Sequence, residues 1–446
     1  MRSWLSKFVL TYPFGINRKR FTVSKLLREI GDFQRFNLRM RINILSGTWL
    51  AVCILLTAES QLPAQTTTHK LPFVEPASVG FDTARWPTIR ELAEQGIAEG
   101  KMPGCVICFG RNGGIVFQEA FGLRKVAPNS EAMTTDTVFD MASITKPLAT
   151  ATSIMKLVEN GKFRIQDRVS KFLPEFALNG KDVISIEDLM LHQSGLIPDN
   201  ALKDYDEGPE IAWKKICALE LVAPVRQAFK YSDVNFIVLA KLVEKASGQN
   251  VHDFSQQHIF EPLEMTETGF LPSASLKARA APTEKRNGEW MRGEVHDPRA
   301  YKLNGIAGHA GLFSTANDLS TYAHMMLGNG TFRGNKSETR ILSPRTVTVM
   351  TQAYSVGTDT SRSNIRGLGW DKQTGYSSNR GDLLSPAAFG HGGFTGTVLW
   401  IDPELDLFFI FLSNRVHPTG DGYVNHLAGQ ILNVIASSIE PQRTQN

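Results

Sequence analysis

The sequence predicts a mixed α/β protein of the α+β type, with one antiparallel sheet flanked by helices and a mostly helical subdomain inserted at about residues 161–330. Three observations lead to this fold class. Short β-rich runs occur near both ends of the 446-residue chain, helical spacing of apolar residues dominates the middle, and an amphipathic helix closes the chain. Strands from both ends would form the sheet, and a cleft would lie between the sheet and the helical subdomain.

The charge of the chain is concentrated at its start. The net charge is +4, but residues 1–41 hold ten Lys or Arg and two acidic residues, a net charge of +8, so the remainder carries −4. A slightly acidic body without a basic stripe argues against nucleic-acid binding. The apolar fraction, 42%, is that of a globular protein with a sizeable core.

The first 79 residues are expected to be targeting and linker sequence rather than part of the fold. An apolar run over residues 42–58 follows two arginines and ends in a small-x-small pattern, which predicts a signal peptide over residues 40–60. Residues 1–39 are then a basic leader or a misassigned start. An uncleaved membrane anchor is the alternative to the signal peptide. Residues 61–79 are predicted to be a linker, and the expected location is periplasmic or secreted.

The body of the protein is predicted to span residues 80–438, with a tail over residues 439–446. A helix is expected over residues 85–99. Two apolar runs, 104–110 and 115–121, flank an Arg-Asn-Gly-Gly sequence, which predicts a β-hairpin.

The rest of the chain alternates between helical and β-rich patterns in long blocks. A helix that starts at about Ile144 is expected to run to Asn160. Further helices are expected over residues 186–191, 209–221, 234–246, 251–259 and 319–327. Strands are expected over residues 387–390, 397–402 and 407–413, before a last helix over residues 423–437.

The cysteines do not form a metal motif. Cys53 would leave with the signal peptide. Cys105 and Cys108 stand three apart in a predicted strand, where side chains point to opposite faces, so we expect both to be buried. No second Cys pair completes a zinc site and no His-Glu-x-x-His sequence is present, so no metal or other cofactor is expected.

The strongest candidate for catalysis is Ser143-x-x-Lys146, within residues 139–148 at the start of a predicted helix. A three-residue spacing on a helix places the Lys146 amine beside the Ser143 hydroxyl. Burial and the positive end of the helix dipole would lower the pKa of Lys146, so that the amine takes the proton and Ser143 acts as a nucleophile. Pro147 supports a helix start at about Ile144. The alternative is an N-cap serine followed by a solvated lysine.

Two further side chains are candidates for proton transfer. Tyr231 stands in a loop that runs into a helix, and its phenol, as phenolate or through Lys146, would relay the proton of Ser143 to the leaving group. The alternative is a buried core tyrosine. His391 would face the cleft as a donor to the substrate or to Tyr231. Residues 191–196 are predicted to be a helix end and loop that line the site structurally.

Residues 389–396 are rich in glycine and lie between β-rich runs. Gly392 and Gly393 would let the backbone approach a bound substrate. The backbone N–H groups of Ser143 and Phe394 would then form an oxyanion hole. The alternative is a glycine-rich turn of a hairpin.

Together and in this order, these stretches resemble the serine β-lactamase and penicillin-binding-protein superfamily over about residues 77–437. The branch is that of class C β-lactamases and their esterase and D-amino-acid-peptidase relatives. Ser143-x-x-Lys146 is similar to the first family motif, Tyr231-Ser232-Asp233 to Tyr-x-Asn, and His391-Gly392-Gly393 to Lys-Thr-Gly. The resemblance implies a β-lactamase-like sheet and a substrate site that includes Asp233, Gly392 and Gly393.

The chain also departs from the family pattern. Asp233 stands where most β-lactamases have asparagine, and His391 stands where they have lysine. Both changes, and the proline after the motif lysine, resemble esterase-like members. By contrast, His296-Asp297 and residues 305–314 resemble a group of cell-wall-associated low-molecular-mass penicillin-binding proteins. His309, within the second stretch, is expected to be a packed structural residue.

We therefore expect a serine hydrolase that acts through an acyl-enzyme on ester or amide bonds, either a carboxylesterase or a D-Ala-D-Ala-type peptidase. A β-lactamase and a non-catalytic penicillin-binding-type sensor or scaffold are the alternatives. The expected partner is a small ester or peptide, with a cell-wall peptide among the candidates. A membrane partner is expected only if the N-terminal segment stays uncleaved.

Overall fold

The structure is a computed structural model that describes residues 71–334, 338–358 and 364–440. The chain divides into two units after Thr66, and all described residues belong to the second unit. The predicted leader and signal peptide, Cys53 and most of the predicted tail lie outside the described residues. Within the described ranges, no helix is long and apolar enough to cross a bilayer.

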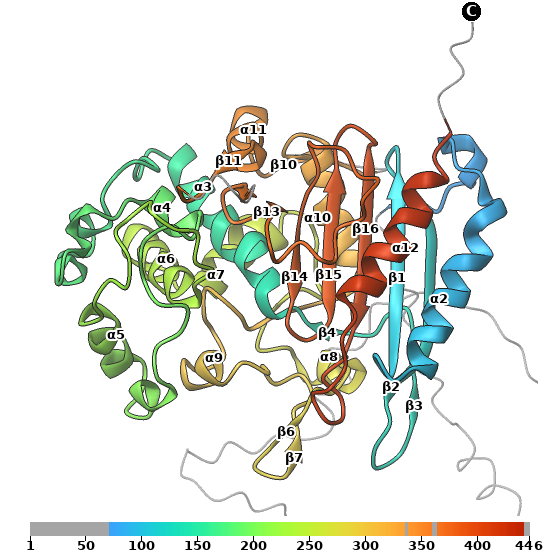
Figure 1. Cartoon of the computed structure of the whole chain (residues 1–446), viewed down its shortest axis with the longest axis horizontal. Coiled ribbons are helices and arrows are strands. Elements are labelled where there is room, and N and C mark those ends of the chain that lie inside the picture. Colours follow the sequence, from blue (N-terminus) through green and yellow to red (C-terminus); the bar gives the residue numbers. More distant parts are fainter. Residues whose placement is uncertain (1–70, 335–337, 359–363, 441–446) are drawn as a thin grey trace, which may run out of the picture. The chain divides into compact units, whose positions relative to one another are not determined.

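A nine-stranded antiparallel sheet takes its strands from both ends of the chain (Figure 1). Its strands are β1 (Gly104–Arg111), β2 (Gly114–Lys125), β3 (Glu131–Ala132), β11 (Tyr354–Ser355), β12 (Ile365–Arg366), β13 (Asp371–Gln373), β14 (Phe389–Gly393), β15 (Thr397–Asp402) and β16 (Leu407–Ser413). The order across the sheet is β11-β12-β13-β14-β15-β16-β1-β2-β3. The pairing of β1 with β16, with Cys105 opposite Ser413, joins the two ends of the chain. The predicted fold class is confirmed.

The first two strands form the predicted hairpin. Asn112 and Gly113 at its tip have φ values of +51° and +77°. Two successive positive φ values are those of a type I′ turn, whose twist matches that of the flanking strands. The Asn-Gly pair in the sequence therefore predicted the position of this turn correctly.

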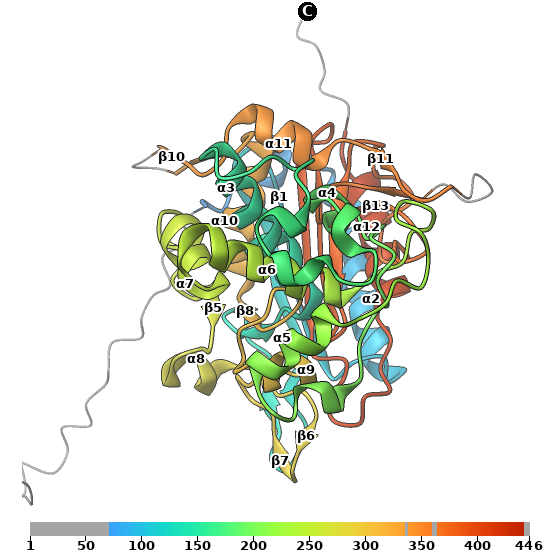
Figure 2. The ribbon, with the colours of Figure 1, turned by 90° about the vertical axis from the view of Figure 1, so that its left-hand side faces the viewer.

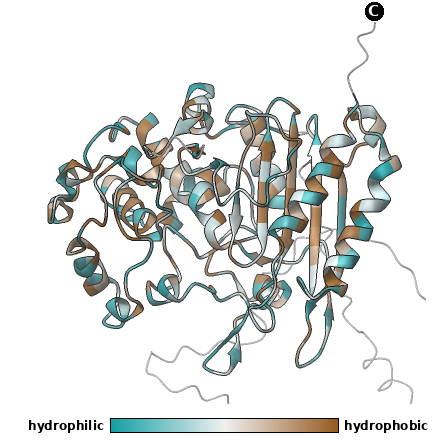
Figure 3. Cartoon of the chain, viewed as in Figure 1, coloured by the Kyte–Doolittle hydropathy of each residue, from teal (hydrophilic) through white to brown (hydrophobic). Residues whose placement is uncertain are grey.

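The two faces of the sheet are buried under different helices. Phe409 of β16 belongs to the hydrophobic cluster that includes α2 (Trp86–Ala98) and α12 (Asn425–Ser437). Its neighbour Ile410 belongs to the cluster on the other face, which includes α10 (Ala316–Leu327). Figure 3 shows the central strands as the most hydrophobic part of the sheet. Both faces are apolar because both are covered.

The cysteines of β1 follow the same division. Cys105 belongs to the cluster under α2 and α12, and Cys108 to the cluster on the opposite face. Both are fully buried, as predicted, and neither forms a disulfide bond. The Cys-x-x-Cys spacing is therefore a consequence of strand packing.

The helices between residues 161 and 330 form a region beside the sheet, seen face-on in Figure 2. They are α4 (Ile186–Met190), α5 (Pro209–Cys217), α6 (Asp233–Ser247), α7 (Val251–Ser255), α8 (Ala274–Arg279) and α9 (Pro298–Lys302). The predicted helical insertion is thus present. However, α10, which lies in the same range of the sequence, packs against β1, β15 and β16.

Several short strands lie outside the predicted ones. β11, β12 and β13 extend the sheet through a segment in which no strand was expected. A small sheet contains β4 (Phe139–Asp140), β8 (Leu312–Ser314) and β5 (Gly269–Phe270), and its strand β4 leads into the Ser143 turn. Two separate pairs are β6 (Lys285–Arg286) with β7 (Glu289–Trp290), and β9 (Thr331–Arg333) with β10 (Glu338–Arg340). Strands of two or three residues are too short to show an alternating pattern.

The described part of the predicted linker packs on the body. Leu71 is 1% exposed. The backbone N–H of Val74 donates to the carbonyl of Ile115 at 2.9 Å, and the N–H of Ile115 donates to the carbonyl of Pro72 at 2.9 Å. Residues 72–74 therefore pair with the start of β2, and this part of the predicted linker belongs to the fold.

Candidate active site

Ser143 lies on a tight turn between β4 and the helix that follows. The turn is a 3₁₀ segment, Ala142–Ile144, and Ala142 has a φ of +45°, which residues with a side chain rarely adopt. The Asp140 carboxylate supports the turn, because it accepts hydrogen bonds from the N–H of Ala142 at 2.8 Å and from the N–H of His296 at 2.7 Å. Backbone strain held in this way is typical of functional turns.

The helix after this turn is irregular at its start. A π-helical segment, Lys146–Ala151, precedes α3 (Thr152–Glu159), and Pro147 stands at the beginning of that segment. The predicted helix end near Asn160 is confirmed, but regular α-helix begins only at Thr152. π-helical segments are rare and are often found at functional sites.

The Lys146 ammonium is completely buried and has three acceptors around it. Its Nζ lies 3.0 Å from Ser143 Oγ and 3.1 Å from the backbone carbonyl of His309. It also lies 2.6 Å from Asp233 Oδ1, and the exposed fraction of its side chain is 0%. The first two contacts are hydrogen bonds, and the third, with Asp233, is an ion pair. The predicted contact between the serine and the lysine is therefore present.

The charge on Lys146 differs from the prediction. Burial lowers the pKa of Lys146, but the Asp233 carboxylate and the Tyr231 phenol oppose burial, and the net effect is a pKa above the usual value. The expected free amine is wrong, because an ion pair holds the proton on Lys146. The sequence assigned Asp233 to substrate recognition, so this pairing was not anticipated.

Tyr231 lies directly against Lys146. Its ring centroid is 4.9 Å from Lys146 Nζ, and the ring stacks on that of His192 at 4.4 Å. Burial raises the pKa of Tyr231 against the lowering influence of Lys146, so the phenol is neutral at rest. Of the two predicted routes, transfer through Lys146 fits this geometry better than a standing phenolate.

His192 has the structural position predicted for residues 191–196. Its Nδ1 accepts a hydrogen bond from the backbone N–H of Ser232 at 3.0 Å. Ser232 in turn caps α6, since its side chain accepts from the N–H of Asn235. The histidine thereby holds Tyr231, which precedes the cap, over the lysine.

His391 lies on β14 beside the same group of side chains. The Tyr231 and His391 ring centroids are 6.0 Å apart. Burial, with the charges of Arg366 and Lys146, holds the pKa of His391 well below its usual value, so the ring is neutral. Its Nδ1 lies 2.7 Å from the carbonyl of Gly392, so Nδ1 carries the proton. Nε2 is then an acceptor, and the predicted donor role is wrong for this state.

The β14–β15 hairpin touches the turn that carries Ser143. Thr395 Oγ1 donates to the carbonyl of Asp140 at 2.7 Å, and Thr397 Oγ1 donates to the carbonyl of Met141 at 3.2 Å. A β-carbon on Gly393 would lie 2.5 Å from the same Met141 carbonyl oxygen, so only glycine fits. Phe394 follows directly. Its assignment to an oxyanion hole with Ser143 stays a prediction.

A cavity of about 360 Å³ opens beside Ser143. Tyr231, His391, Gly392, Gly393 and Phe394 of the predicted set line it. Side chains that the sequence did not single out complete the lining, among them Arg366, Asp371, Tyr376, Asn379, Arg415 and Tyr423. Asp233 is not part of the lining, and its assignment to substrate binding stays a prediction.

A second ion pair lies behind Lys146. The Nε2 atom of His309 is 3.0 Å from Asp297 Oδ1, and His309 is 1% exposed. Although burial opposes it, Asp297 raises the pKa of His309. These two residues were not predicted to act in the site. The sequence feature that could have identified them is the resemblance of residues 305–314 to cell-wall-associated relatives.

The donors around Lys146 do not favour a metal ion. Ligand atoms of Asp233, Asp297 and His309 lie within 4.8 Å of one another. However, Lys146 Nζ occupies the position next to Asp233, and His309 is paired with Asp297. The positive charge that the two carboxylates require is already supplied by side chains, so a divalent cation would have to displace Lys146.

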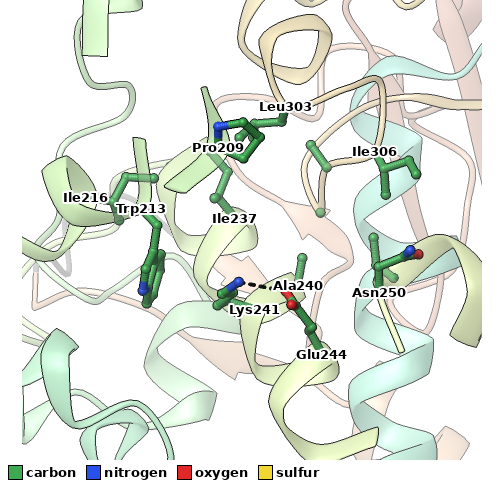
Figure 4. Close-up of a pocket in the computed structure, with 13 residues that line it drawn as sticks. Pro209, Trp213, Ile216, Ile237, Ala240, Lys241, Glu244, Asn250, Leu303 and Ile306 are labelled. Carbon is green, nitrogen blue, oxygen red and sulfur yellow. Dashed lines mark hydrogen bonds and ion pairs between the residues drawn. The ribbon is translucent and has the colours of Figure 1, made fainter. Parts of the chain in front are cut away.

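A separate cavity of about 130 Å³ lies between α5, α6 and residues 303–308 (Figure 4). Trp213, Ile237 and Ile306 line it, and the ion pair of Lys241 with Glu244 lies within it. None of the predicted site residues is part of this lining. The chemistry therefore belongs to the cavity beside Ser143.

The fold and this site define a serine hydrolase with a lysine and a tyrosine beside its nucleophile. The chain belongs to the Beta-lactamase family, whose sequence model matches residues 89–432. The resemblance noted from the motifs is confirmed.

Three comparisons describe its relatives. The chain is 30% identical to the N-acetylmuramyl-L-alanine amidase of Bacillus subtilis (strain 168), over 77% of this chain and 85% of that one. It is 30% identical to the "Putative D-alanyl-D-alanine carboxypeptidase" of Escherichia coli (strain K12), over 78% and 87%. The solved structure of EstCE1, a hydrolase with promiscuous acyltransferase activity, has a TM-score of 0.63 and 21% identity, and covers 79% of this chain and 98% of that chain. The last comparison concerns the fold alone.

Proposed function

We propose that the protein cleaves a D-alanine-type amide bond in small cell-wall peptides through an acyl-enzyme on Ser143. The observation that carries the proposal is the position of Lys146 Nζ, 3.0 Å from Ser143 Oγ and 2.6 Å from Asp233 Oδ1. This ion pair provides a place for the serine proton inside a buried site. The names of the two relatives at 30% identity, an amidase and a carboxypeptidase, support a peptide substrate.

In the proposed first step, Ser143 Oγ attacks the carbonyl carbon. The Lys146–Asp233 pair takes up the Ser143 proton through Lys146, which contacts Ser143 Oγ, and holds it until the leaving amine is protonated. The backbone N–H groups of Ser143 and Phe394 stabilise the oxyanion. When the C–N bond breaks, Tyr231 protonates the leaving amine and regains a proton from Lys146.

In the second step, water attacks the acyl-enzyme. His391 lines the cavity, and its Nε2 has no partner among the described residues, so we propose that this atom takes a proton from the water and returns it to Ser143 through Tyr231. The C–O bond of the ester breaks, and the acid product leaves. The cycle closes with Lys146 and Asp233 as an ion pair.

Ester hydrolysis is the second candidate activity. Residues 391–393 have no lysine and no hydroxyl group where the resemblance places the pair that receives a substrate carboxylate. A neutral ester needs neither group. For the same reason, and because Asp233 replaces the motif asparagine, we propose that turnover of β-lactams is slow.

Export to the periplasm or the medium is part of the proposal. It is supported by residues 40–60 of the sequence alone, and a cell-wall peptide as substrate agrees with it. N-terminal sequencing of the mature protein tests it, because a chain that begins at Met1 would contradict export.

The activity test is a substrate panel run on the wild type and on Ser143→Ala. Peptides that end in D-Ala-D-Ala, short-chain p-nitrophenyl esters and nitrocefin cover the three alternatives. We expect peptide and ester hydrolysis in the wild type and a loss of at least about 1,000-fold in Ser143→Ala. Ser437→Ala, an exposed serine on α12, is the control and should be as active as the wild type. Activity that survives Ser143→Ala would contradict the proposal.

A further inference from the structure

The backbone around His309 is fixed to the helix that follows Ser143. Thr150 Oγ1 donates a hydrogen bond to the carbonyl of Gly308 at 2.7 Å. The carbonyl of the next residue, His309, accepts a hydrogen bond from Lys146 Nζ at 3.1 Å. The main chain of His309 is therefore part of the immediate surroundings of the lysine.

The side chain of His309 is buried beside two carboxylates. Its Nε2 lies 3.0 Å from Asp297 Oδ1, and the residue is 1% exposed. One ring nitrogen of His309 and one carboxylate oxygen each of Asp297 and Asp233 lie within 4.8 Å of one another. Asp233 Oδ1 is in turn 2.6 Å from Lys146 Nζ. Asp233 therefore lies between two basic side chains.

The imidazole of His309 is held in its charged form. Burial lowers the pKa of His309, but the carboxylates of Asp297 and Asp233 outweigh burial, so that the net pKa is above the usual value. Burial also raises the pKa of Asp297, and the charge of His309 reverses this effect. The charged groups around the imidazole are those of Lys146, Asp199, Asp233, Asp297 and, paired with Asp199, Arg299.

Asp297 is held in place by its own helix. It is the N-cap of α9, and its Oδ1 accepts a hydrogen bond from the N–H of Ala300 at 2.7 Å. The preceding residue, His296, donates its backbone N–H to Asp140, which supports the Ser143 turn. The carboxylate that holds the imidazole is therefore tied to the turn that carries the nucleophile.

A second cation beside Asp233 affects how tightly Lys146 holds its proton. Despite burial, the pKa of Lys146 lies above its usual value because of Asp233. A base of this strength takes up a proton easily but releases it slowly, and general acid–base catalysis requires both steps. Lys146 lowers the pKa of His309, so the two cations repel each other. The charge of His309 thus opposes the field of Asp233 at Lys146, and proton release costs less free energy.

We propose that His309, held by Asp297, is a positioning residue that makes Lys146 release its proton more readily towards the leaving group. It acts through Asp233 and does not line the active-site cavity. The inference rests on the proposed function, in which this proton passes from Lys146 through Tyr231. It follows that the histidine matters most where the leaving group needs a proton.

The test compares butyrate esters whose leaving groups differ in their need for a proton. p-Nitrophenolate leaves without one, whereas ethoxide requires one, and phenolate is intermediate. In Asp297→Asn, which keeps the shape and removes the charge, we expect kcat/KM for ethyl butyrate to fall by about 10- to 100-fold, part of the contribution of a general acid. The value for p-nitrophenyl butyrate should change by less than about 2-fold, and phenyl butyrate should lie between the two.

Two further variants accompany this comparison. Asp297→Glu restores the charge on a longer side chain and should recover part of the ethyl ester rate. Asp82→Asn removes an exposed carboxylate that also caps a helix, and as the matched control it should lower neither rate. Because both rates scale with the folded fraction of a sample, their ratio is independent of partial misfolding.

Acid should restore the activity of Asp297→Asn. Without the charge of Asp297, burial outweighs the remaining carboxylate and the pKa of His309 falls, so the imidazole regains its proton only on acidification. The loss on ethyl butyrate, relative to the wild type, should therefore shrink between about pH 8 and about pH 5. His309→Gln has no ring to protonate and should show the same loss at every pH.

An unchanged ratio of the ethyl and p-nitrophenyl rates in Asp297→Asn would overturn the inference and assign the pair a structural role. A loss in this variant that does not change with pH would overturn it as well. Ester hydrolysis that depends on Ser143 would still stand in both cases. A wild type that hydrolyses esters but no D-Ala-D-Ala peptide would contradict the proposed substrate instead, and the ester comparison would still decide the role of His309.

Discussion

Asp233 determines the chemical state of the residues around Ser143. A lysine buried without a partner loses its proton easily, and the sequence alone suggests that outcome for Lys146. The Asp233 carboxylate at 2.6 Å reverses it and raises the pKa of Lys146. The base of this site is consequently the pair of side chains, and neither member acts alone.

Replacement of Asp233 by Asn should change the pH dependence of catalysis. Without the carboxylate, burial dominates and the pKa of Lys146 falls below its ordinary value of 10.5. The neutral amine then becomes the base, so kcat/KM should rise with pH as the amine loses its proton. In the wild type the ion pair keeps one protonation state across neutral pH, and the profile should be flat there.

A pH–rate profile of p-nitrophenyl ester hydrolysis measures this difference. Asp182→Asn, an exposed carboxylate, is the control and should keep the flat profile. Identical profiles for the wild type and Asp233→Asn would show that Asp233 does not set the charge of Lys146.

The residues of the site were predictable to different degrees. Ser143, Lys146 and Tyr231 belong to short motifs whose spacing or position suggests a role, and they lie together as expected. Arg366 belongs to a two-residue strand with no pattern around it. Its place beside Tyr231 depends on packing between two segments that are far apart in the sequence, which the spacing of residues does not encode.

At the scale of elements, the β14–β15 hairpin acts as a brace for the Ser143 turn. Hydroxyls of Thr395 and Thr397 bind carbonyls of that turn, and Gly393 lies against it. The glycines were expected to let a substrate approach. The contact of Gly393 shows that this glycine also lets two protein segments approach each other, and its predicted role towards the substrate stays a prediction.

A β-carbon at position 393 should displace the Ser143 turn. In Gly393→Ala, the new atom would lie 2.5 Å from the Met141 carbonyl oxygen, closer than atoms can approach. A shift of about 1 Å at the nucleophile costs roughly 100-fold in rate, so we expect kcat to fall by that factor. Ester hydrolysis, with thermal unfolding as a check on folding, measures the effect.

Gly375→Ala is the matched control, because a β-carbon there meets no atom within 4 Å. Equal activity of the two variants would contradict the idea that the β14–β15 hairpin fixes the position of the Ser143 turn.

The longer elements were predictable, and the short ones were not. The strand β16 matches the expected range of residues 407–413, and α6 exceeds its expected range by one residue at each end. α6 contains several helical turns, and β16 is a continuous run of apolar residues, so both have a pattern that the sequence shows. β12 has two residues, and tertiary pairing alone makes it a strand, so its sequence has no signal to find.

At the scale of the whole molecule, two hydrophobic layers enclose the sheet, and each layer contains a buried cysteine. Cys105 and Cys108 lie in opposite layers, and Cys217 lies in the helical region. Burial raises the pKa of all three thiols, which removes the reactive thiolate. Their reactivity therefore depends on opening of the fold.

We expect the three thiols to resist Ellman's reagent in the native protein and to react together on unfolding. Titration across a urea gradient in a Cys53→Ser background measures this, and it should follow the loss of far-ultraviolet circular dichroism. Rapid labelling of Cys105 or Cys108 under native conditions would contradict a closed sheet. Labelling of Cys217 at lower urea would instead show that the helical region opens first.

The pairing of β1 with β16 also has a consequence for how the chain is made. The ribosome adds about 300 residues between these neighbouring strands, and closing so long a loop is slow. An apolar strand made early must wait for its partner until synthesis is almost complete. Such a delay agrees with the export proposed above, because a chain passes through a translocation channel before it folds.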